Sequence, residues 1–328
     1  MIVTRTPLRI SFFGGGSDLN YFLDSGHHST IVGGSVNKYI YNVIKVSTES
    51  DFDQSRYRIG YREVEQVDCL DDIKHRPIRE ALRKYNLTNG VELHHIADLP
   101  AKTGLGSSSA FVNGLTLGLE YASGKNPSTF DLARKSIHFE QQVLNEHVGC
   151  QDQILTALGG FNILRIEDSV TFEARNLYDE CEEFINMLNQ WLVVCFTGIK
   201  RSADTTTKAQ VSRGADNFNA LKDIVSIAEE AVTCIEARNL SGFAELLNIS
   251  WERKKSLHRG VSNSAIDDLI NHGLNHGAIG SKLLGAGAGG FVAFLVPPER
   301  QQSFKNNIKA DILDDLWFEN EGATRVYP

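Results

Sequence analysis

The sequence predicts a protein that mixes β-strands and α-helices in two parts of different character. Its 328 residues suffice for one large domain or for two ordinary ones, each with its own hydrophobic core. Strand patterns are frequent in the first part, whereas the second part holds long amphipathic helices between two apolar strands. We expect the boundary within residues 160–190 and divide the chain into domains of residues 1–178 and 179–328.

Strands are predicted where apolar and polar residues alternate, or where β-branched and aromatic residues gather. The expected strands are residues 4–12, 35–46, 57–61, 91–96, 191–196 and 291–296. Helices are predicted where apolar residues recur every three or four positions, and Ser128 with Asp131 resembles a capping box. The expected helices are residues 78–85, 108–122, 128–145, 151–158, 215–238, 240–256 and 262–275.

The composition excludes several classes of protein. With 41% hydrophobic and 23% charged residues it is typical of a soluble globular protein, and no apolar run approaches the length of a membrane span. The N-terminus lacks the apolar core of a signal peptide, so we expect a cytoplasmic protein. A net charge of −8 argues against binding to nucleic acid or to an anionic membrane, since both require a basic surface.

The cysteines and histidines show no metal-binding pattern. Five scattered cysteines without Cys-x-x-Cys spacing argue against a disulfide framework and against a zinc site. The ten histidines include no His-Glu-x-x-His motif. The adjacent pairs His27–His28 and His94–His95 would point to opposite faces of a strand, so we expect structural roles for them.

Residues 100–110, Pro-Ala-Lys-Thr-Gly-Leu-Gly-Ser-Ser-Ser-Ala, form the clearest candidate binding site. Gly104 and Gly106 let the backbone approach an anion closely. A helix that begins at the serines would direct its unpaired N–H groups and the positive end of its dipole at that anion. No Gly-Lys-Ser/Thr follows the glycines, so the segment is not a Walker A loop. A serine-capped helix after a flexible turn is the alternative explanation.

Two further glycine-rich segments lie near the ends of the chain. Residues 14–18, Gly-Gly-Gly-Ser-Asp, follow the first predicted strand, where glycines indicate a close approach to the backbone. Taken alone, Arg9 on that strand is better explained as a surface cation, and Asp18 equally well as a helix N-cap. Residues 285–290 match the Gly-x-Gly-x-x-Gly pattern of dinucleotide-binding folds, but a strand follows them where that fold requires a helix.

The three motifs in this order, residues 7–14 with Asp18, residues 100–110 and residues 285–292, resemble those of the GHMP kinases. That family includes galactokinase, homoserine kinase, mevalonate kinase and phosphomevalonate kinase, and the resemblance covers nearly the whole chain. It implies an α+β fold of two domains, with the ATP loop in the N-terminal domain and a ferredoxin-like C-terminal domain. It further implies that residues 104–109 and the following helix bind ATP, with Mg²⁺ as cofactor, and that a small-molecule acceptor lies in the cleft between the domains.

The resemblance also implies roles for individual residues. Asp152 matches the catalytic carboxylate and Arg9 the basic residue of the first motif, although a helix-capping role would explain Asp152 taken alone. Ser108 and Glu140 match the Mg²⁺ ligands. The residues expected to bind ATP are Pro100, Lys102, Gly104, Leu105, Gly106, Ser107, Ser108 and Ser109. Those expected to bind the acceptor are Gly15, Gly16, Ser17, Asp18 and Gly287. Such residues fit phosphoryl transfer, which depends on positioning and on charge stabilisation.

One difference from galactokinase argues against galactose as the acceptor. Galactokinase has Glu-His where this chain has Gly15 and Gly16. The three motifs, together with Gln-Asp-Gln at 151–153, are more similar to bacterial D-glycero-D-manno-heptose 7-phosphate kinases and to the kinase portions of fucose-salvage enzymes. A sugar 1-kinase is therefore expected, with heptose 7-phosphate as acceptor and fucose as the alternative. The acceptor's phosphate requires a cationic clamp. Lys200, Arg201 and Ser202 are the candidates, and a solvated charged turn is the other explanation for them.

Two other classes of function remain open at this point. One is a non-catalytic sensor that binds ATP and sugar and signals to a protein partner, a class that damage to residues 107–110 or loss of Asp152 would favour; both are intact. The other is an oxidoreductase that uses residues 285–290, which predicts nicotinamide binding and no ATPase activity.

Overall fold

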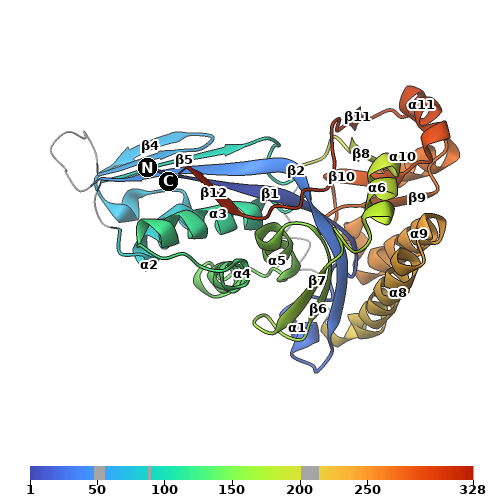
Figure 1. The fold of residues 1–328 in the computed structure, drawn as a ribbon, viewed down its shortest axis with the longest axis horizontal. Coiled ribbons are helices and arrows are strands. Elements are labelled where there is room, and N and C mark those ends of the chain that lie inside the picture. Colours follow the sequence, from blue (N-terminus) through green and yellow to red (C-terminus); the bar gives the residue numbers. More distant parts are fainter. Residues whose placement is uncertain (48–55, 88–89, 201–213, 328) are drawn as a thin grey trace.

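Two β-sheets organise the residues that the computed structural model describes, which are 1–47, 56–87, 90–200 and 214–327 (Figure 1). The first sheet follows the order β12-β1-β2-β5-β3-β4, with β6 pairing to both β2 and β7. Its strands are β1 (Ile2–Phe13), β2 (Ser29–Val46), β3 (Tyr57–Gly60), β4 (Val64–Val67), β5 (Val91–Ala97), β6 (Phe161–Ile166), β7 (Phe172–Asn176) and β12 (Thr324–Tyr327). The second sheet contains β8 (Leu192–Phe196), β9 (Gly280–Leu283), β10 (Phe291–Leu295) and β11 (Asp311–Ile312).

Helices cover each sheet. Figure 1 shows α2, α3, α4 and α5 on one side of the first sheet, with the other long helices around the second. The first group is α2 (Arg76–Lys84), α3 (Ser107–Ala122), α4 (Thr129–His138) and α5 (Gln151–Leu158), and the short α1 spans Asn20–Leu23. The second group is α6 (Glu182–Trp191), α8 (Phe218–Glu236), α9 (Leu240–Leu257), α10 (Ser264–Asn275) and α11 (Pro298–Asn307). No helix among the residues described is both long enough and apolar enough to cross a membrane.

The second sheet has ferredoxin-like topology. Its strands run in the spatial order β11-β8-β10-β9, which is 4-1-3-2 in chain order, and every neighbouring pair is antiparallel. Helices lie between β8 and β9, and α11 lies between β10 and β11, which completes the β-α-β-β-α-β pattern. The α+β class and the ferredoxin-like second part are therefore confirmed.

A shared hydrophobic core joins the two sheets. Phe12 and Phe13 at the end of β1 pack against Phe243 of α9, with ring centroids 5.6 and 4.9 Å apart. All three side chains are fully buried. Because β1 and α9 both border the cavity described below, this contact holds the two parts of the chain in a fixed relation around it.

The chain's C-terminal end returns to the first sheet. The β12 strand pairs antiparallel with β1, and Phe318 bridges to Val36, so the two termini lie side by side (Figure 1). Residues 318–327 therefore accompany the first sheet although they follow the second in sequence. The division at residues 178 and 179 stays a prediction for the rest of the chain.

Several elements differ from expectation at their ends. The helix expected over 128–145 is α4, capped by the Ser128 hydroxyl, which accepts a hydrogen bond from Asp131 N at 3.2 Å. A π-helical turn, Phe139–Val143, continues it and carries Glu140. Helix α1 has Leu19 at its N-cap position, with no side-chain cap. The capping role considered for Asp18 is therefore wrong, and its carboxylate bonds elsewhere.

Candidate active site

The three glycine-rich motifs converge on a cavity of about 620 Å³, a volume typical of small-molecule sites. The loop before α3 lies between β1 and the loop before β10. Arg9 N donates to Leu105 O at 3.0 Å, and Phe291 N donates to Thr103 O at 3.1 Å. Segments that are 96 residues apart (9 and 105) and 188 residues apart (103 and 291) along the chain thus form one wall of the cavity.

The N-terminus of α3 opens into this cavity. Gly106 occupies the N-cap position with φ of +73°, and no side chain caps the helix. A Cβ atom at residue 106 would lie 2.9 Å from Arg9 Cγ, so the backbone approach requires glycine. Ser107, Ser108 and Ser109 form the first helical turn and line the cavity. Their N–H groups are in the position that favours an anion.

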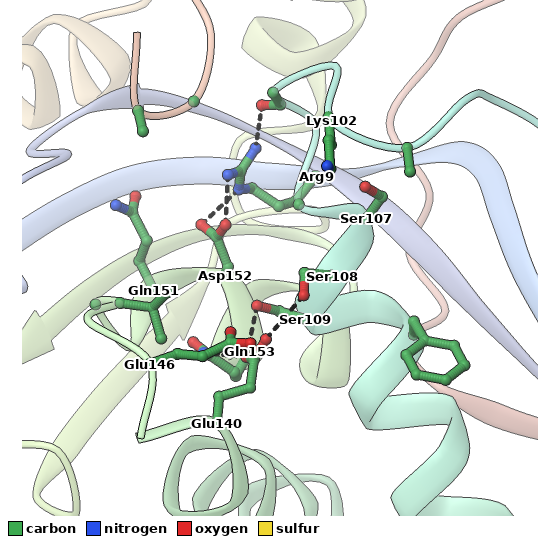
Figure 2. Close-up of a pocket in the computed structure, with 18 of the residues that line it drawn as sticks. Arg9, Lys102, Ser107, Ser108, Ser109, Glu140, Glu146, Gln151, Asp152 and Gln153 are labelled. Atoms are coloured by element: carbon green, nitrogen blue, oxygen red, sulfur yellow. Dashed lines mark hydrogen bonds and ion pairs between the residues drawn. The ribbon is translucent and has the colours of Figure 1, made fainter. Parts of the chain in front are cut away.

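Arg9 and Asp152 form a bidentate ion pair at the centre of the cavity (Figure 2). Arg9 Nε donates to Asp152 Oδ1 at 2.7 Å, and Nη2 donates to Oδ2 at 2.6 Å. The third nitrogen, Nη1, donates to Gly104 O at 2.7 Å and so joins the pair to the glycine loop. The Arg9 side chain is 5% exposed and that of Asp152 is 28% exposed, so the carboxylate is the accessible partner.

Glu140 lies below the serines with its carboxylate fully buried (Figure 2). Ser108 Oγ donates to Oε1 at 3.2 Å, Ser109 Oγ donates to Oε2 at 2.8 Å, and the Gln153 amide also donates to Oε2. Burial raises the pKa of Glu140 to about 7, although the hydrogen bonds from Ser109 and Gln153 oppose this shift. Glu140 is therefore poised between its neutral and charged forms near neutral pH.

The pair of Ser108 and Glu140 suits a Mg²⁺ ion that is held mainly by a bound phosphate chain. No three His, Cys, Asp or Glu side chains in the described parts of the chain cluster closely enough to hold a metal by themselves. Mg²⁺ in phosphate-transferring sites commonly uses one or two protein oxygens and takes its other ligands from phosphates and water. One hydroxyl and one carboxylate match that donor set.

The burial of Glu140 leads to a pH-dependent prediction for the metal-free protein. The folded state keeps the Glu140 proton up to a pH of about 7, whereas the unfolded chain loses it near 4.5. Stability therefore falls as the pH rises between these values. Glu140→Gln has no ionisable group at this position, so its stability lacks this pH dependence. The Tm of the variant minus the Tm of the wild type should therefore increase as the pH is raised from 4.5 to 7. Thermal unfolding in a chelator measures this, with Glu173→Gln at an exposed site as control. A constant difference would contradict it.

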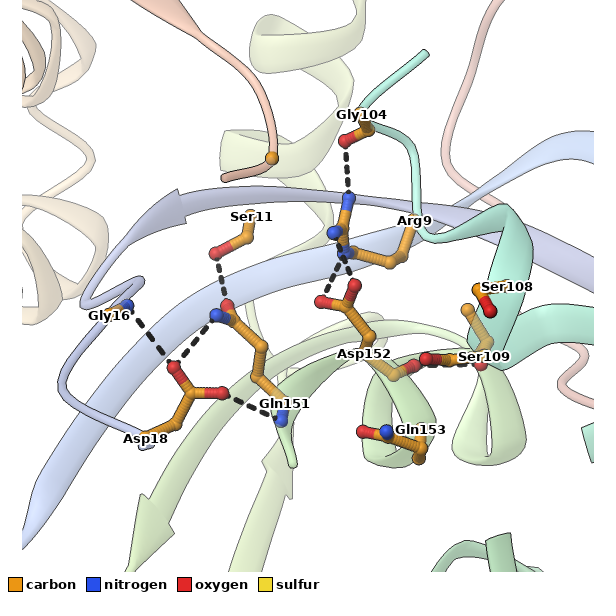
Figure 3. Close-up of polar contacts among 12 residues, drawn as sticks. Arg9, Ser11, Gly16, Asp18, Gly104, Ser108, Ser109, Gln151, Asp152 and Gln153 are labelled. Atoms are coloured by element: carbon orange, nitrogen blue, oxygen red, sulfur yellow. Dashed lines mark hydrogen bonds and ion pairs between the residues drawn. The ribbon is translucent and has the colours of Figure 1, made fainter. Parts of the chain in front are cut away.

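Asp18 lies at the other side of the ion pair (Figure 3). Its carboxylate accepts hydrogen bonds from Gly16 N at 3.1 Å, Gln151 N at 3.1 Å and Gln151 Nε2 at 2.9 Å. Ser11 Oγ donates to Gln151 Oε1 at 2.6 Å and fixes the amide. Burial raises the pKa of Asp18 above its ordinary value. This network orients Asp18 within the cavity wall.

The start of α5 connects these groups through three consecutive residues. Gln151 bonds to Asp18, Asp152 bonds to Arg9, and Gln153 bonds to Glu140. Successive helical residues point about 100° apart, so three neighbours on one turn reach three different directions. Asp152 is therefore held between the buried Glu140 and the Asp18 network.

Sequence reasoning missed one end of the cavity and one cation. The missed end is apolar and aromatic, and its lining includes Ile40, His75, His95, Ala97, Leu99 and Phe111. Burial lowers the pKa of both histidines, to about 4 for His95, so both rings are neutral at pH 7. The missed cation is Lys254 on α9, which also lines the cavity. No local pattern marks these residues, because only the fold brings them together.

Not every residue expected at the site borders the cavity. Lys102, Gly15, Gly16 and Gly287 line it. Four other expected residues do not line it. Leu105 is buried in the core, whereas Pro100 and Lys200 are exposed. The Ser17 hydroxyl is buried and bonds to Gly14 O and Ser29 Oγ. Arg201 and Ser202 lie outside the described residues.

Comparison with known families decides the class of the protein. Residues 74–160 match the model of the GHMP kinases N terminal domain, and residues 228–312 match that of the GHMP kinases C terminal domain. Together the two matches span just over half of the chain. The chain belongs to the GHMP kinase family. This GHMP kinase is accordingly an enzyme with ATP as its phosphate donor, which removes the oxidoreductase alternative.

Individual relatives of this GHMP kinase resemble it over different lengths. It is 26% identical over 347 residues to the D-glycero-alpha-D-manno-heptose 7-phosphate kinase of Campylobacter jejuni, covering 98% of both proteins. It is 24% identical to the L-fucokinase/L-fucose-1-P guanylyltransferase of Bacteroides fragilis over 71% of this chain and 25% of that enzyme. The crystal structure of a D-glycero-D-manno-heptose 1-phosphate kinase from Bacteroides thetaiotaomicron has the same fold, with a TM-score of 0.80, 21% identity, and coverage of 100% and 99%.

Proposed function

We propose that this GHMP kinase is a sugar kinase that transfers the γ-phosphoryl group of ATP to the anomeric hydroxyl of D-glycero-D-manno-heptose 7-phosphate. The product is the 1,7-bisphosphate. The observation that carries the proposal is the junction at α5, where Asp152 lies between the serine turn of α3 and the Asp18 network. The Campylobacter relative, similar along nearly its whole length, supports the choice of acceptor. A location in the cytoplasm remains part of the prediction.

ATP would lie across the serine turn. Its phosphates would accept hydrogen bonds from the N–H groups of residues 107–109. Ser108 and Glu140 are the residues that would hold Mg²⁺, which would offset the negative charge of the phosphates. Its adenine would occupy the apolar end, against the cluster that Phe111 forms with the neutral rings of His75 and His95. The Nδ1 atom of His95 is buried without a hydrogen-bond partner among the described residues, and the nucleobase supplies one.

Asp152 and Arg9 have different roles in the proposed reaction. The anomeric oxygen of the acceptor attacks the γ-phosphorus, the bond from phosphorus to the ADP oxygen breaks, and the hydroxyl proton passes to the Asp152 carboxylate. Arg9 fixes the orientation of that carboxylate through two hydrogen bonds. Its positive charge also offsets negative charge that develops on the transferred group.

The acceptor would lie on the Asp18 side of Asp152. Asp18 matches the aspartate that holds sugar hydroxyls in galactokinase-like members of the family, and here Gln151 and Gly16 hold it in place. Gly15 and Gly16 add no side chains to this part of the cavity, which leaves room for a sugar longer than a hexose. L-fucose is the second candidate, because the Bacteroides fragilis enzyme matches much of this chain.

A coupled ADP-release assay with Mg-ATP tests the proposal. The acceptor panel is D-glycero-D-manno-heptose 7-phosphate, L-fucose, galactose and mannose. We expect turnover with the heptose phosphate alone, and Asp152→Asn serves as the control for enzyme-dependent ADP release. Turnover restricted to an unphosphorylated sugar would reject the proposed acceptor while leaving the kinase class intact. Bound ATP without turnover on any acceptor would favour the sensor.

A further inference from the structure

Lys254 is a buried cation that faces the cavity and that the reaction described above does not use. Its side chain extends from α9, and the residue is 7% exposed. The ammonium group donates to Gly285 O at 2.6 Å, which uses one of its three protons. No carboxylate of the described residues lies within 4.0 Å of Nζ. Burial, followed by the nearby charge of Arg9, lowers the pKa of Lys254 to about 8, so it is mainly charged at pH 7.

The carboxylates whose charges act on Lys254 already accept hydrogen bonds from other groups. Both carboxylate oxygens of Asp152 accept hydrogen bonds from Arg9. Asp18 accepts three hydrogen bonds from Gly16 and Gln151 (Figure 3). The charges of Asp18 and Asp152 act on Lys254 and partly oppose the lowering of its pKa, but neither carboxylate forms an ion pair with it. A buried cation without a directly paired anion is unfavourable, so an anion that enters beside Lys254 gains more than one at an exposed lysine would.

The space beside Lys254 suits an anion with several oxygens. A Cβ atom at Gly15 would lie 3.6 Å from Nζ, so the absent side chain leaves the ammonium open to the cavity. Ala286 and Gly287 follow the carbonyl that Lys254 bonds, and both line the cavity. Their N–H groups donate to no other described residue. One ammonium and two backbone N–H groups form the kind of donor set that binds a phosphate monoester.

We propose that Lys254, together with the N–H groups of Ala286 and Gly287, binds the phosphate group that the sugar acceptor already carries. The inference rests on the proposed function, namely that the acceptor is a sugar phosphate. It assigns to α9 and to the loop before β10 the clamp that the sequence suggested for Lys200, Arg201 and Ser202. Lys200 is exposed and does not line the cavity, and the other two lie outside the described residues. Gly15 contributes by leaving the space between Lys254 and Gln151 empty.

The test compares each acceptor with its dephosphorylated form. With D-glycero-D-manno-heptose 7-phosphate and D-glycero-D-manno-heptose, Lys254→Met should lower the ratio of the two kcat/KM values by about 10–100-fold, mainly through KM for the phosphorylated sugar. Lys254→Arg, which keeps the charge, should restore part of that ratio. Lys255→Met removes a cation from the same helix away from this cavity, and it should leave the ratio unchanged.

A second variant tests the same site without removing Lys254. Gly15→Glu places a carboxylate beside Nζ, and its Cβ would meet only ordinary contacts of 3.5 Å or more, so folding should be retained. It should lower the same ratio by neutralising the ammonium.

The outcomes separate this inference from the proposed function. If the wild type prefers a different sugar phosphate, the heptose proposal fails, and the ratio measured on that sugar phosphate still decides the role of Lys254. If Lys254→Met and Gly15→Glu lower kcat/KM equally for the phosphorylated and the dephosphorylated sugar, the inference is overturned. Such a result is expected if Lys254 has a structural role or contacts the transferred phosphoryl group. Wild-type activity on neutral sugars alone would overturn both.

Discussion

Asp152→Asn is expected to lower turnover by about 10²–10⁴, which corresponds to about 2.7–5.4 kcal/mol of transition-state stabilisation. Asparagine has nearly the same shape, but it cannot take the acceptor's proton. Its amide group would also oppose the Arg9 guanidinium, because both are hydrogen-bond donors. Since the Asp152 carboxylate bonds to Arg9 and forms no hydrogen bond with the serine turn of α3, the apparent affinity for ATP should change by no more than about threefold.

Steady-state kinetics with varied ATP and varied acceptor measure both parameters. Asp179→Asn is the matched control, because Asp179 is exposed in the turn after β7 and does not line the cavity. Its kinetic constants should equal those of the wild type. Unchanged turnover in Asp152→Asn would remove the carboxylate from the reaction, whereas a loss confined to ATP affinity would assign it to nucleotide binding.

Arg9→Met should reduce turnover by about 10²–10³. Three groups lose a partner in this variant: both oxygens of Asp152 and the carbonyl of Gly104. Arg9→Lys should recover little, because an ammonium group cannot reproduce the two parallel hydrogen bonds of a guanidinium. Arg5→Met is the control, since Arg5 belongs to the same strand but forms its ion pair with Glu321 away from the cavity.

The double variant of Arg9→Met with Asp152→Asn tests whether the two residues act as a unit. We expect its turnover to be no more than about tenfold below that of the slower single variant, because each substitution already disables the same pair. Losses that multiply fully would show that the two residues act independently. In that case the bidentate contact would not be needed to orient Asp152.

Local patterns predicted the elements well where neighbouring residues decide the conformation. Ser128 caps α4 as expected, and the strand of residues 291–296 corresponds to β10. Strand β2 was expected from residue 35 but begins at Ser29. Glycines normally weaken strands, yet a Cβ at Gly33 would lie 2.6 Å from Ile10 O, so glycine is required by the neighbouring strand. That requirement comes from tertiary packing and is invisible along the sequence.

The residues of the candidate site were likewise predictable only in part. Spacing and glycine content singled out the segments that contain Arg9, Asp18 and Ser108, since each lies in a compact motif. The position of Lys254 could not be inferred, because a lysine on a long amphipathic helix is ordinarily solvated. Its burial follows from the docking of α9 against β1 and against the loop before β10.

The sequence by itself indicated the family, the kind of chemistry and the glycine-rich segments that border the cavity, because these motifs and their order can be read directly along the chain. Only the tertiary structure decided which side chains meet. It joined Asp152 to Arg9, placed neutral His95 at the apolar end and left Lys254 facing an open space beside Gly15. The physical reason is that burial and charge pairing depend on contacts between residues distant in sequence, and these contacts arise only when the two sheets share one core.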